Sequence, residues 1–146
     1  MGDADDSYNF LELSLFIERL QAGYDMVMGN RFAGGITKGA MPWLHRYVGN
    51  PFLSSLGRFL FMNNIGDFHC GLRAFTKKCY NIINPQCNGM EFASELVALA
   101  SIHQMRICEI PVILYPDGRK RRPHLRSWRD GFRHMVLLYS LYLLRN

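Results

Sequence analysis

Met1-Gly2-Asp3-Ala4-Asp5-Asp6-Ser7-Tyr8 opens the chain and decides how the rest of it is interpreted. Asp3 and Asp5 are one residue apart, and like charges at this spacing repel unless a cation or water lies between them. Mg2+ and Mn2+ prefer oxygen ligands and often take one or two carboxylates together with the phosphate oxygens of a substrate. The spacing therefore predicts a Mg2+ or Mn2+ site for a phosphorylated ligand. The alternative is a solvated acidic segment that caps a helix beginning near Asn9.

Three later stretches follow the acidic opening. They are Met28-Gly29-Asn30-Arg31-Phe32, then Gly66-Asp67-Phe68-His69-Cys70-Gly71-Leu72-Arg73-Ala74-Phe75, then Gly89-Met90-Glu91-Phe92-Ala93-Ser94-Glu95. In this order after Asp-Ala-Asp, they resemble glycosyltransferase family 2. More narrowly, they are similar to the polyprenyl-phosphate sugar transferases related to dolichyl-phosphate mannose and glucose synthases.

The resemblance implies an α/β fold of the GT-A type, in which a mostly parallel sheet is flanked by helices. The family places its Asp-x-Asp motif at the end of a strand in the middle of the catalytic domain, whereas here the motif begins at residue 3. We therefore expect residues 1–134 to be the C-terminal part of such a domain. The N-terminal nucleotide-binding half would be missing, and the fragment alone would be inactive. Residues 135–146 are expected to form an interfacial or truncated membrane helix, since about 20 apolar residues are needed to span a bilayer.

Composition and charge indicate a globular chain with an anionic partner. The 146 residues are 49% hydrophobic and carry a net charge of +5, with seven Lys or Arg against two Asp between residues 117 and 134. Such a cluster predicts binding to phosphate or anionic lipid. Nucleic acid is not expected as a partner, because the cluster has no recognisable docking motif and only one aromatic residue before Phe132. The four cysteines include no C-x-x-C pair and are expected to be reduced thiols in the core.

Hydrophobic periodicity predicts helices and strands in alternation. Helices are expected over residues 9–21 and 91–102, and two amphipathic helices over residues 42–62, interrupted at Pro51. Strands are expected over residues 24–29 and 106–114. Pro111 places the second strand at a sheet edge, because proline cannot donate to a ladder.

The candidate site residues are arginines and carboxylates around these elements. Arg31 follows a strand at the edge where open α/β sheets bind ligands. The resemblance implies that Arg31 faces the acceptor phosphate, with Arg46 near it. It also implies that Asp67 lies beside the sugar and the acceptor phosphate, and that Glu91 lies near the substrate. Arginine forks match phosphate oxygens, and the family folds a basic loop over the diphosphate, for which we select Arg119 and Arg126.

The function implied is inverting, metal-dependent transfer of a sugar from UDP- or GDP-hexose to a polyprenyl phosphate. The enzyme would act at the cytoplasmic face of a membrane, where the aromatic and basic helices of residues 42–62 would contact the lipid interface. A second interpretation is a family 2 enzyme with a hydroxyl acceptor, which would need a base, either Asp67 or Glu91. A third is a non-catalytic basic module that binds anionic lipid.

Overall fold

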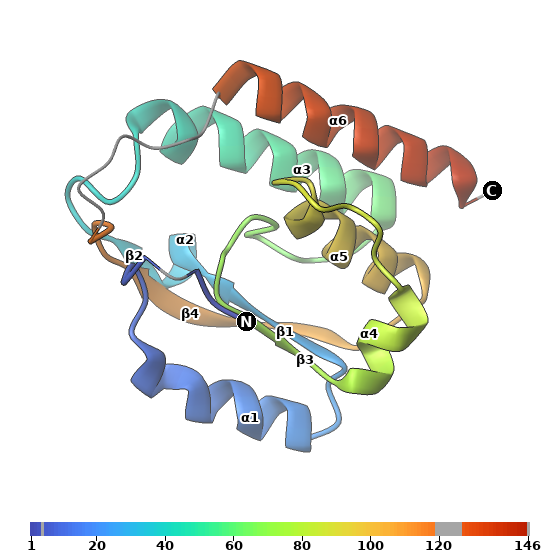
Figure 1. Ribbon diagram of the computed structural model, residues 1–146, viewed down its shortest axis with the longest axis horizontal. Coiled ribbons are helices and arrows are strands. Elements are labelled where there is room, and N and C mark those ends of the chain that lie inside the picture. The colour runs from blue at the N-terminus through green and yellow to red at the C-terminus, as the bar shows by residue number, and fades with distance from the viewer. Residues whose placement is uncertain (4, 119–126, 146) are drawn as a thin grey trace.

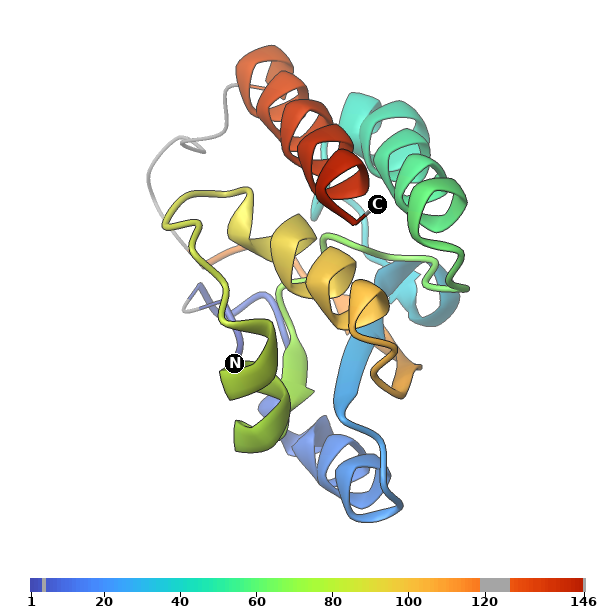
Figure 2. The ribbon, with the colours of Figure 1, turned by 90° about the vertical axis from the view of Figure 1, so that its right-hand side faces the viewer.

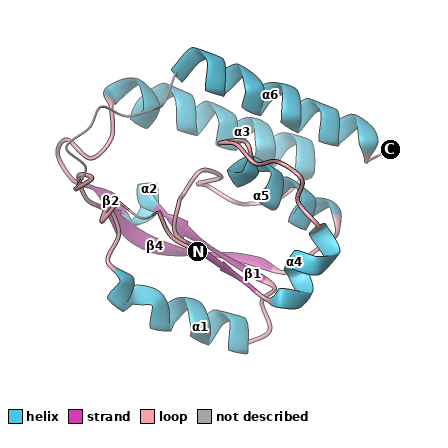
Figure 3. Ribbon diagram, in the orientation of Figure 1, coloured by secondary structure: helices cyan, strands magenta, loops and turns pink. Residues whose placement is uncertain are grey.

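A computed structural model describes residues 1–3, 5–118 and 127–145 and shows layers built around one sheet (Figure 1). The elements in chain order are η1 (Phe10–Glu12), α1 (Leu13–Gln21), β1 (Met26–Asn30), α2 (Arg31–Gly34), β2 (Gly35–Ile36), η2 (His45–Gly49), α3 (Asn50–Phe61), β3 (Arg73–Phe75), α4 (Lys77–Ile83), α5 (Phe92–Ile102), β4 (Ile107–Leu114) and α6 (Ser127–Leu144). Helix α1 covers one face of the sheet, and α5 and α4 cover the other, as the colouring by secondary structure in Figure 3 makes plain.

The sheet is mostly parallel. Its strand order is β2-β4-β1-β3. β4 is parallel to both β1 and β2, and β3 is antiparallel to β1. The α/β fold class with helices flanking a mostly parallel sheet is thus confirmed, and the architecture is compatible with a partial GT-A fold.

Apolar side chains fill both faces of this sheet. On the α1 face, Phe16 packs in one cluster with Val27 and Val112. On the opposite face, Met28 packs in a second cluster with Leu96 of α5. Because successive side chains of a strand point to opposite faces, β1 supplies both clusters. A strand buried on both faces is typical of parallel sheets covered by helices.

The segment 42–62 forms η2 and α3, which follow one another without a gap. The prediction that Pro51 interrupts the helix is wrong, because the helical backbone continues from η2 through Pro51 into α3. The N–H of Asn50, the residue before Pro51, donates to the backbone oxygen of His45, so the hydrogen bonding of η2 extends up to the proline.

Helix α6 forms an outer layer beside α3 (Figure 2). It is a single helix of 18 residues that continues across residue 134, and its Leu138 is fully buried against Leu60 and Ala98. None of the helices within the described ranges is long and apolar enough to cross a membrane.

The position of β4 differs from the prediction that it lies at an edge. β4 lies between β2 and β1. However, β2 pairs only with Ile113 and Leu114, so Pro111 has a strand partner on the β1 side alone, opposite Asn30. The missing N–H of Pro111 therefore costs no bond to β2. Beside this point, the backbone of α2 approaches β4 so closely that a Cβ on Gly34 would lie 2.3 Å from the Val112 backbone nitrogen.

Candidate active site

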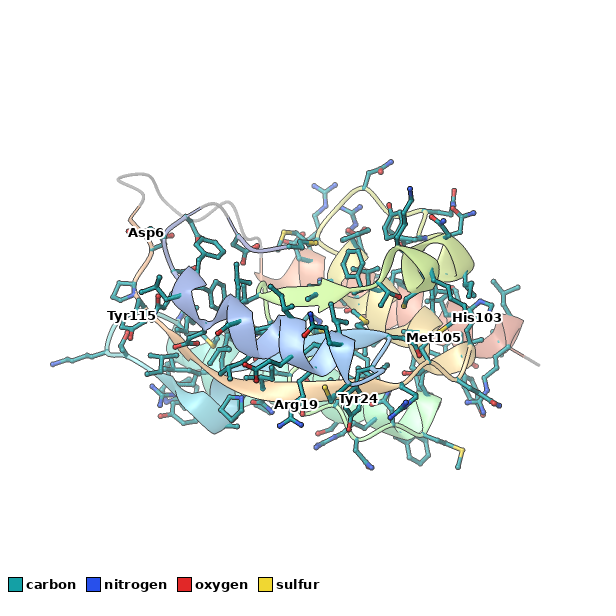
Figure 4. The ribbon with its side chains drawn as sticks, turned by 90° about the horizontal axis from the view of Figure 1, so that it is seen from below. Asp6, Arg19, Tyr24, His103, Met105 and Tyr115 are labelled. Atoms are coloured by element: carbon teal, nitrogen blue, oxygen red, sulfur yellow. The ribbon has the colours of Figure 1, made fainter. Side chains whose placement is uncertain are left out.

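The candidate site lies at the carboxyl ends of β1 and β4. Arg31 directly follows β1, and Tyr115 directly follows β4. Figure 4 shows Asp6 and Tyr115 at one end of the molecule and Met105, which precedes β4, at the other. The acidic N-terminal segment therefore lies at the sheet edge where open α/β folds bind their ligands.

Arg31 and Asp67 form a buried ion pair at this edge. Arg31 Nε and Nη2 donate to the two carboxylate oxygens of Asp67, each over 2.7 Å, and the Arg31 backbone N–H donates to Oδ2 over 3.1 Å. Asp67 is fully buried and Arg31 is 8% exposed. Burial alone would lower the pKa of the Arg31 guanidinium, but the hydrogen bonds and charge of Asp67 raise it, so the group stays cationic. Two predicted site residues are thus in direct contact, and the bidentate pair fixes the plane of the guanidinium.

Glu109 holds the turn that carries Asp67. Its two carboxylate oxygens accept hydrogen bonds from the backbone N–H groups of Gly66 and Asp67, each over 3.0 Å. Glu109 stands opposite Met28 in the register of β4 with β1. Sequence reasoning missed this residue, because a charged side chain in a strand ordinarily faces solvent. The available signal was the position of Glu109 among the apolar residues Ile107, Ile110 and Val112 of a predicted strand.

The acidic residues Asp3 and Asp5 lie at the same end of the chain but have different surroundings. Asp3 is exposed and lies against the turn at Gly71, where a Cβ would be 1.8 Å from Asp3 Oδ2. A side chain at position 71 would force this carboxylate to move. Asp5 accepts hydrogen bonds from the Ser7 N–H, over 3.2 Å, and from the Ser7 hydroxyl. Its backbone oxygen accepts from the N–H of Gly118, over 2.8 Å, which ties this segment to the one after β4.

No protein-only metal cluster is present in the part of the chain that the structure describes, where no group of three or more His, Cys, Asp or Glu residues could hold an ion. Two carboxylates are nevertheless a suitable donor set for Mg2+ or Mn2+, since these ions commonly complete their coordination with water and substrate phosphate. Asp3 and Asp5 therefore fit the predicted ion chemically, with Asp3 accessible to solvent.

A buried polar cluster that was not predicted lies behind the turn. Ser94 Oγ is 2.9 Å from His69 Nε2 and 2.8 Å from His134 Nδ1, and the two imidazole rings meet edge to face with centroids 4.8 Å apart. Burial, followed by the neighbouring charges of His134 and the arginines Arg31 and Arg73, lowers the pKa of His69 well below its usual value. Burial also lowers the pKa of His134. Both imidazoles are therefore neutral near pH 7.

Glu91 and Glu95 lie four residues apart at the start of α5 and have separate roles in the structure. Glu91 precedes the first turn of α5 and forms an ion pair with Arg133 of α6. Glu95 is 4% exposed and accepts hydrogen bonds from the backbone N–H groups of Gln86 and Cys87, the latter over 2.8 Å. Glu91 thus connects α5 to α6, and Glu95 holds the loop that leads to α5.

Of the remaining predicted arginines, Arg46 makes other contacts and two lie outside the described residues. Arg46 belongs to η2, where its Nη1 donates to the backbone oxygen of Ile36 over 3.3 Å and its guanidinium stacks 5.3 Å from the ring centroid of Tyr47. Arg119 and Arg126, the residues selected for diphosphate binding, fall outside the described residues.

A cavity of about 150 Å3 lies beside Asp3. Its wall includes His69, Gly71 and Phe92, and Arg73 lies behind it, fully buried. The guanidinium of Arg73 donates to backbone carbonyl oxygens, and burial lowers its pKa. The cavity thus joins the acidic N-terminal segment, the turn after Asp67 and the start of α5, which are the regions of the predicted motifs.

This fold and arrangement define the class: an α/β domain whose sheet edge gathers carboxylates and an arginine suited to a phosphorylated ligand. No family model matches the sequence. The chain is 38% identical over 136 residues to the low-salt glycan biosynthesis hexosyltransferase Agl6 of Haloferax volcanii, an alignment that covers 92% of this chain and 32% of that protein. It is 33% identical over 112 residues to the dolichyl-phosphate hexose transferase of the same organism, covering 75% of this chain and 46% of the relative.

A further relative is the polyprenol monophosphomannose synthase of Mycolicibacterium smegmatis, 29% identical over 113 residues, which cover 75% of this chain and 42% of that protein. The chain is thus similar over most of its length to named glycosyltransferases, two of which carry dolichyl phosphate or polyprenol in their names, and the resemblance indicated by its motifs is confirmed. The chain spans 32% to 46% of the length of these relatives.

Proposed function

We propose that this chain forms the acceptor side of an inverting, metal-dependent glycosyltransferase that moves a hexose from UDP- or GDP-hexose to a polyprenyl phosphate. The observation that carries the proposal is the buried, oriented guanidinium of Arg31 at the carboxyl end of β1. Two relatives support it, since their names specify dolichyl phosphate and polyprenol as the lipids involved.

The chemistry of such a transfer needs cations more than it needs a base. A lipid phosphate is already anionic, so it can attack the anomeric carbon without losing a proton, and Arg31 would bind and orient it. Arg46 would lie further along the acceptor. Attack from the face opposite the leaving diphosphate inverts the anomeric configuration. The hexose would lie in the cavity beside Asp3, between His69 and Phe92.

The leaving nucleoside diphosphate develops negative charge, which must be stabilised. Asp3 and Asp5 would hold Mg2+ or Mn2+, and the bound ion would supply positive charge to the diphosphate oxygens. Arg119 and Arg126 are proposed to contribute further positive charge there. The acidic N-terminal segment would therefore hold the cation, and Arg31 at the end of β1 would bind the acceptor phosphate.

We place the protein at the cytoplasmic face of a membrane, through the outer layer of α3, η2 and α6. Large apolar side chains are exposed along these helices and could enter the lipid interface, with Arg46 and Arg58 near the headgroups. They are Trp43, Tyr47, Val48, Phe52 and Phe59 on the η2–α3 side, and Phe132, Val136, Tyr139 and Leu143 on α6.

The test is transfer by the intact protein and by its Arg31→Ala variant, with short-chain polyprenyl phosphate compared against free sugars and glycolipids. We expect the variant to lose at least a hundredfold in transfer to polyprenyl phosphate while hydrolysis of the nucleotide sugar changes little. Arg19→Ala is the matched control, because Arg19 is exposed on α1 across the sheet. Equal transfer by Arg31→Ala and wild type would contradict the role of Arg31.

A hydroxyl acceptor is the second candidate. Glu91 favours it, because its Oε2 is buried without a hydrogen-bond partner among the described residues and could accept a proton. Transfer by the wild type only to sugars or glycolipids, with activity lost in Glu91→Gln, would establish this second function in place of the first.

A further inference from the structure

We propose that Glu109 is a positioning residue for Arg31, acting through the turn at Gly66 and Asp67. The inference rests on the proposed function, in which Arg31 binds the acceptor phosphate. Glu109 does not touch that phosphate, and its effect passes through backbone and side-chain hydrogen bonds. The alternative is that Glu109 stabilises the fold without influencing Arg31.

The carboxylate of Asp67 is saturated with hydrogen-bond donors. Oδ2 accepts from Arg31 Nε and the Arg31 N–H, while Oδ1 accepts from Arg31 Nη2 and from the N–H of His69 over 3.3 Å. A carboxylate has about four lone-pair sites, so these four bonds use its accepting capacity. Asp67 therefore orients the guanidinium and has no site left to take a proton from an acceptor.

The orientation of Asp67 depends on the turn that carries it. The turn that carries it has no ladder partner in the sheet, because β3 begins only at Arg73. Glu109 accepts hydrogen bonds from two successive N–H groups of the turn over 3.0 Å each, and the next N–H, that of Phe68, donates to Ser54 Oγ over 3.2 Å. Next to the contact with Glu109, a Cβ on Gly66 would lie 2.9 Å from Asn30 Nδ2, so the turn rests directly on the end of β1.

The alternation of side chains along β4 determines which face Glu109 occupies. Ile110 and Val112 pack on the α1 face of the sheet. Because successive side chains of a strand point to opposite faces, Glu109 lies on the other face, where it meets the turn. Glu109 is half-buried, and its bonds to the turn compensate for the contact with water that its carboxylate loses. The order of contacts is therefore Glu109, then the turn, then Asp67, then Arg31.

The test uses Glu109→Gln in the intact protein, with Glu18→Gln as the matched control. A glutamine keeps the size of Glu109 but offers one accepting oxygen in place of two. Glu18 is exposed on α1, so its substitution makes the same change in charge away from the turn. We expect Glu109→Gln to raise KM for short-chain polyprenyl phosphate at least tenfold while KM for the nucleotide sugar stays within twofold.

A double-mutant cycle with Asp67→Asn separates positioning from general destabilisation. If both residues act on the same guanidinium, the double variant should be no worse in acceptor KM than Asp67→Asn alone. Multiplying effects of the two substitutions, or equal rises in both KM values, would overturn the inference.

A spectroscopic measurement keeps the inference separate from the proposed function. The Nε–H proton of Arg31, observed by NMR with labelled arginine and assigned by its loss in Arg31→Lys, should exchange with water at least tenfold faster in Glu109→Gln than in Glu18→Gln. Unchanged exchange would overturn the positioning role whatever the acceptor is. Faster exchange in a protein that uses only hydroxyl acceptors would support positioning and contradict the phosphate acceptor.

Discussion

Gly71 determines where the Asp3 carboxylate can lie. Because a Cβ at position 71 would overlap Asp3 Oδ2, we expect Gly71→Ala to displace the Asp3 carboxylate and to lower transfer as much as Asp3→Ala does. Losing a charge partner of the transition state costs on the order of 3 kcal/mol, about a hundredfold in rate. The measurement is transfer as a function of Mn2+ concentration in the intact protein.

Gly131→Ala is the control for this prediction, because nothing lies within 4 Å of a Cβ at that position of α6. It should transfer as the wild type does. Full activity in the presence of a chelator, or in an Asp3→Ala, Asp5→Ala double variant, would show that these residues hold no essential ion.

The lowered pKa values of His69 and His134 predict a dependence of stability on pH. Both have a folded-state pKa below the ordinary value, so the unfolded chain takes up protons near pH 6.5 while the folded chain does not. Stability is therefore complete above about pH 6.5 and falls as the pH drops below it, by about 1.4 kcal/mol per unit for each histidine until the folded-state pKa is reached. The measurement is urea unfolding between pH 7.5 and 5.5.

The His134→Gln variant isolates this effect from the titration of other groups. Its stability should fall less steeply with decreasing pH than that of the wild type, by about the contribution of one histidine. Identical slopes for the two proteins would mean that His134 is free to protonate in the folded state.

At the residue scale, the chemical type of the site residues could be predicted from the sequence, but their contacts could not. Arg31 and Asp67 could be selected from their motifs, yet nothing in a linear pattern shows that residues 36 positions apart form one ion pair. Ser94 and His134 were missed because a serine and a histidine within apolar helices resemble ordinary helix residues. Their significance arises only when α5 and α6 pack and the polar groups must satisfy one another.

Among the elements, α3 ends at a residue in a conformation that costs energy. Met62 has φ 51° and caps the helix in the left-handed region, which residues with a Cβ resist. Glycine adopts this conformation without that cost, and Met62 is 83% exposed, so little packing would be lost. We expect Met62→Gly to raise the free energy of unfolding by about 0.5–1 kcal/mol. Met62→Ala keeps the Cβ and should show no gain, and equal stability of the two variants in urea would contradict this explanation.

The longer elements were predictable and the shorter ones were not. Residues 9–21, 91–102 and 106–114 contain enough turns or alternations to show their period, and the structure forms η1 with α1, α5 and β4 there. β3 has three residues and β2 has two, which is too short for a pattern to be visible. Their existence depends on pairing with β1 and β4, a tertiary property. Helix α4, with seven residues, likewise depends on packing more than on its own periodicity.

For the molecule as a whole, the α3–α6 surface is predicted to bind lipid, and the surface of η1 and α1 is not. Helices α3 and α1 lie on opposite sides of the sheet (Figure 1). Phe59 of α3 is 80% exposed, and Leu11 of η1, which leads directly into α1, is 88% exposed. If the α3–α6 layer enters the interface, Phe59→Asp should weaken binding to vesicles with anionic lipid about tenfold or more, because burial of an aromatic side chain contributes about 1.5–3 kcal/mol. Leu11→Asp should bind as the wild type does. Equal losses in a vesicle sedimentation assay would contradict the assignment of this layer to the membrane.

The close approach of α2 to β4 has a consequence for attempts to redesign the acceptor. A side chain at Gly34 would overlap the Val112 backbone, and one at Gly29 would lie 2.7 Å from Cys70 Sγ. A mutant library that randomises the loop around Arg31 would therefore be dominated by misfolded members if it included these two glycines. New specificity is better sought by diversifying the exposed positions of η2 and the segment before it, with residues 29 and 34 left unchanged.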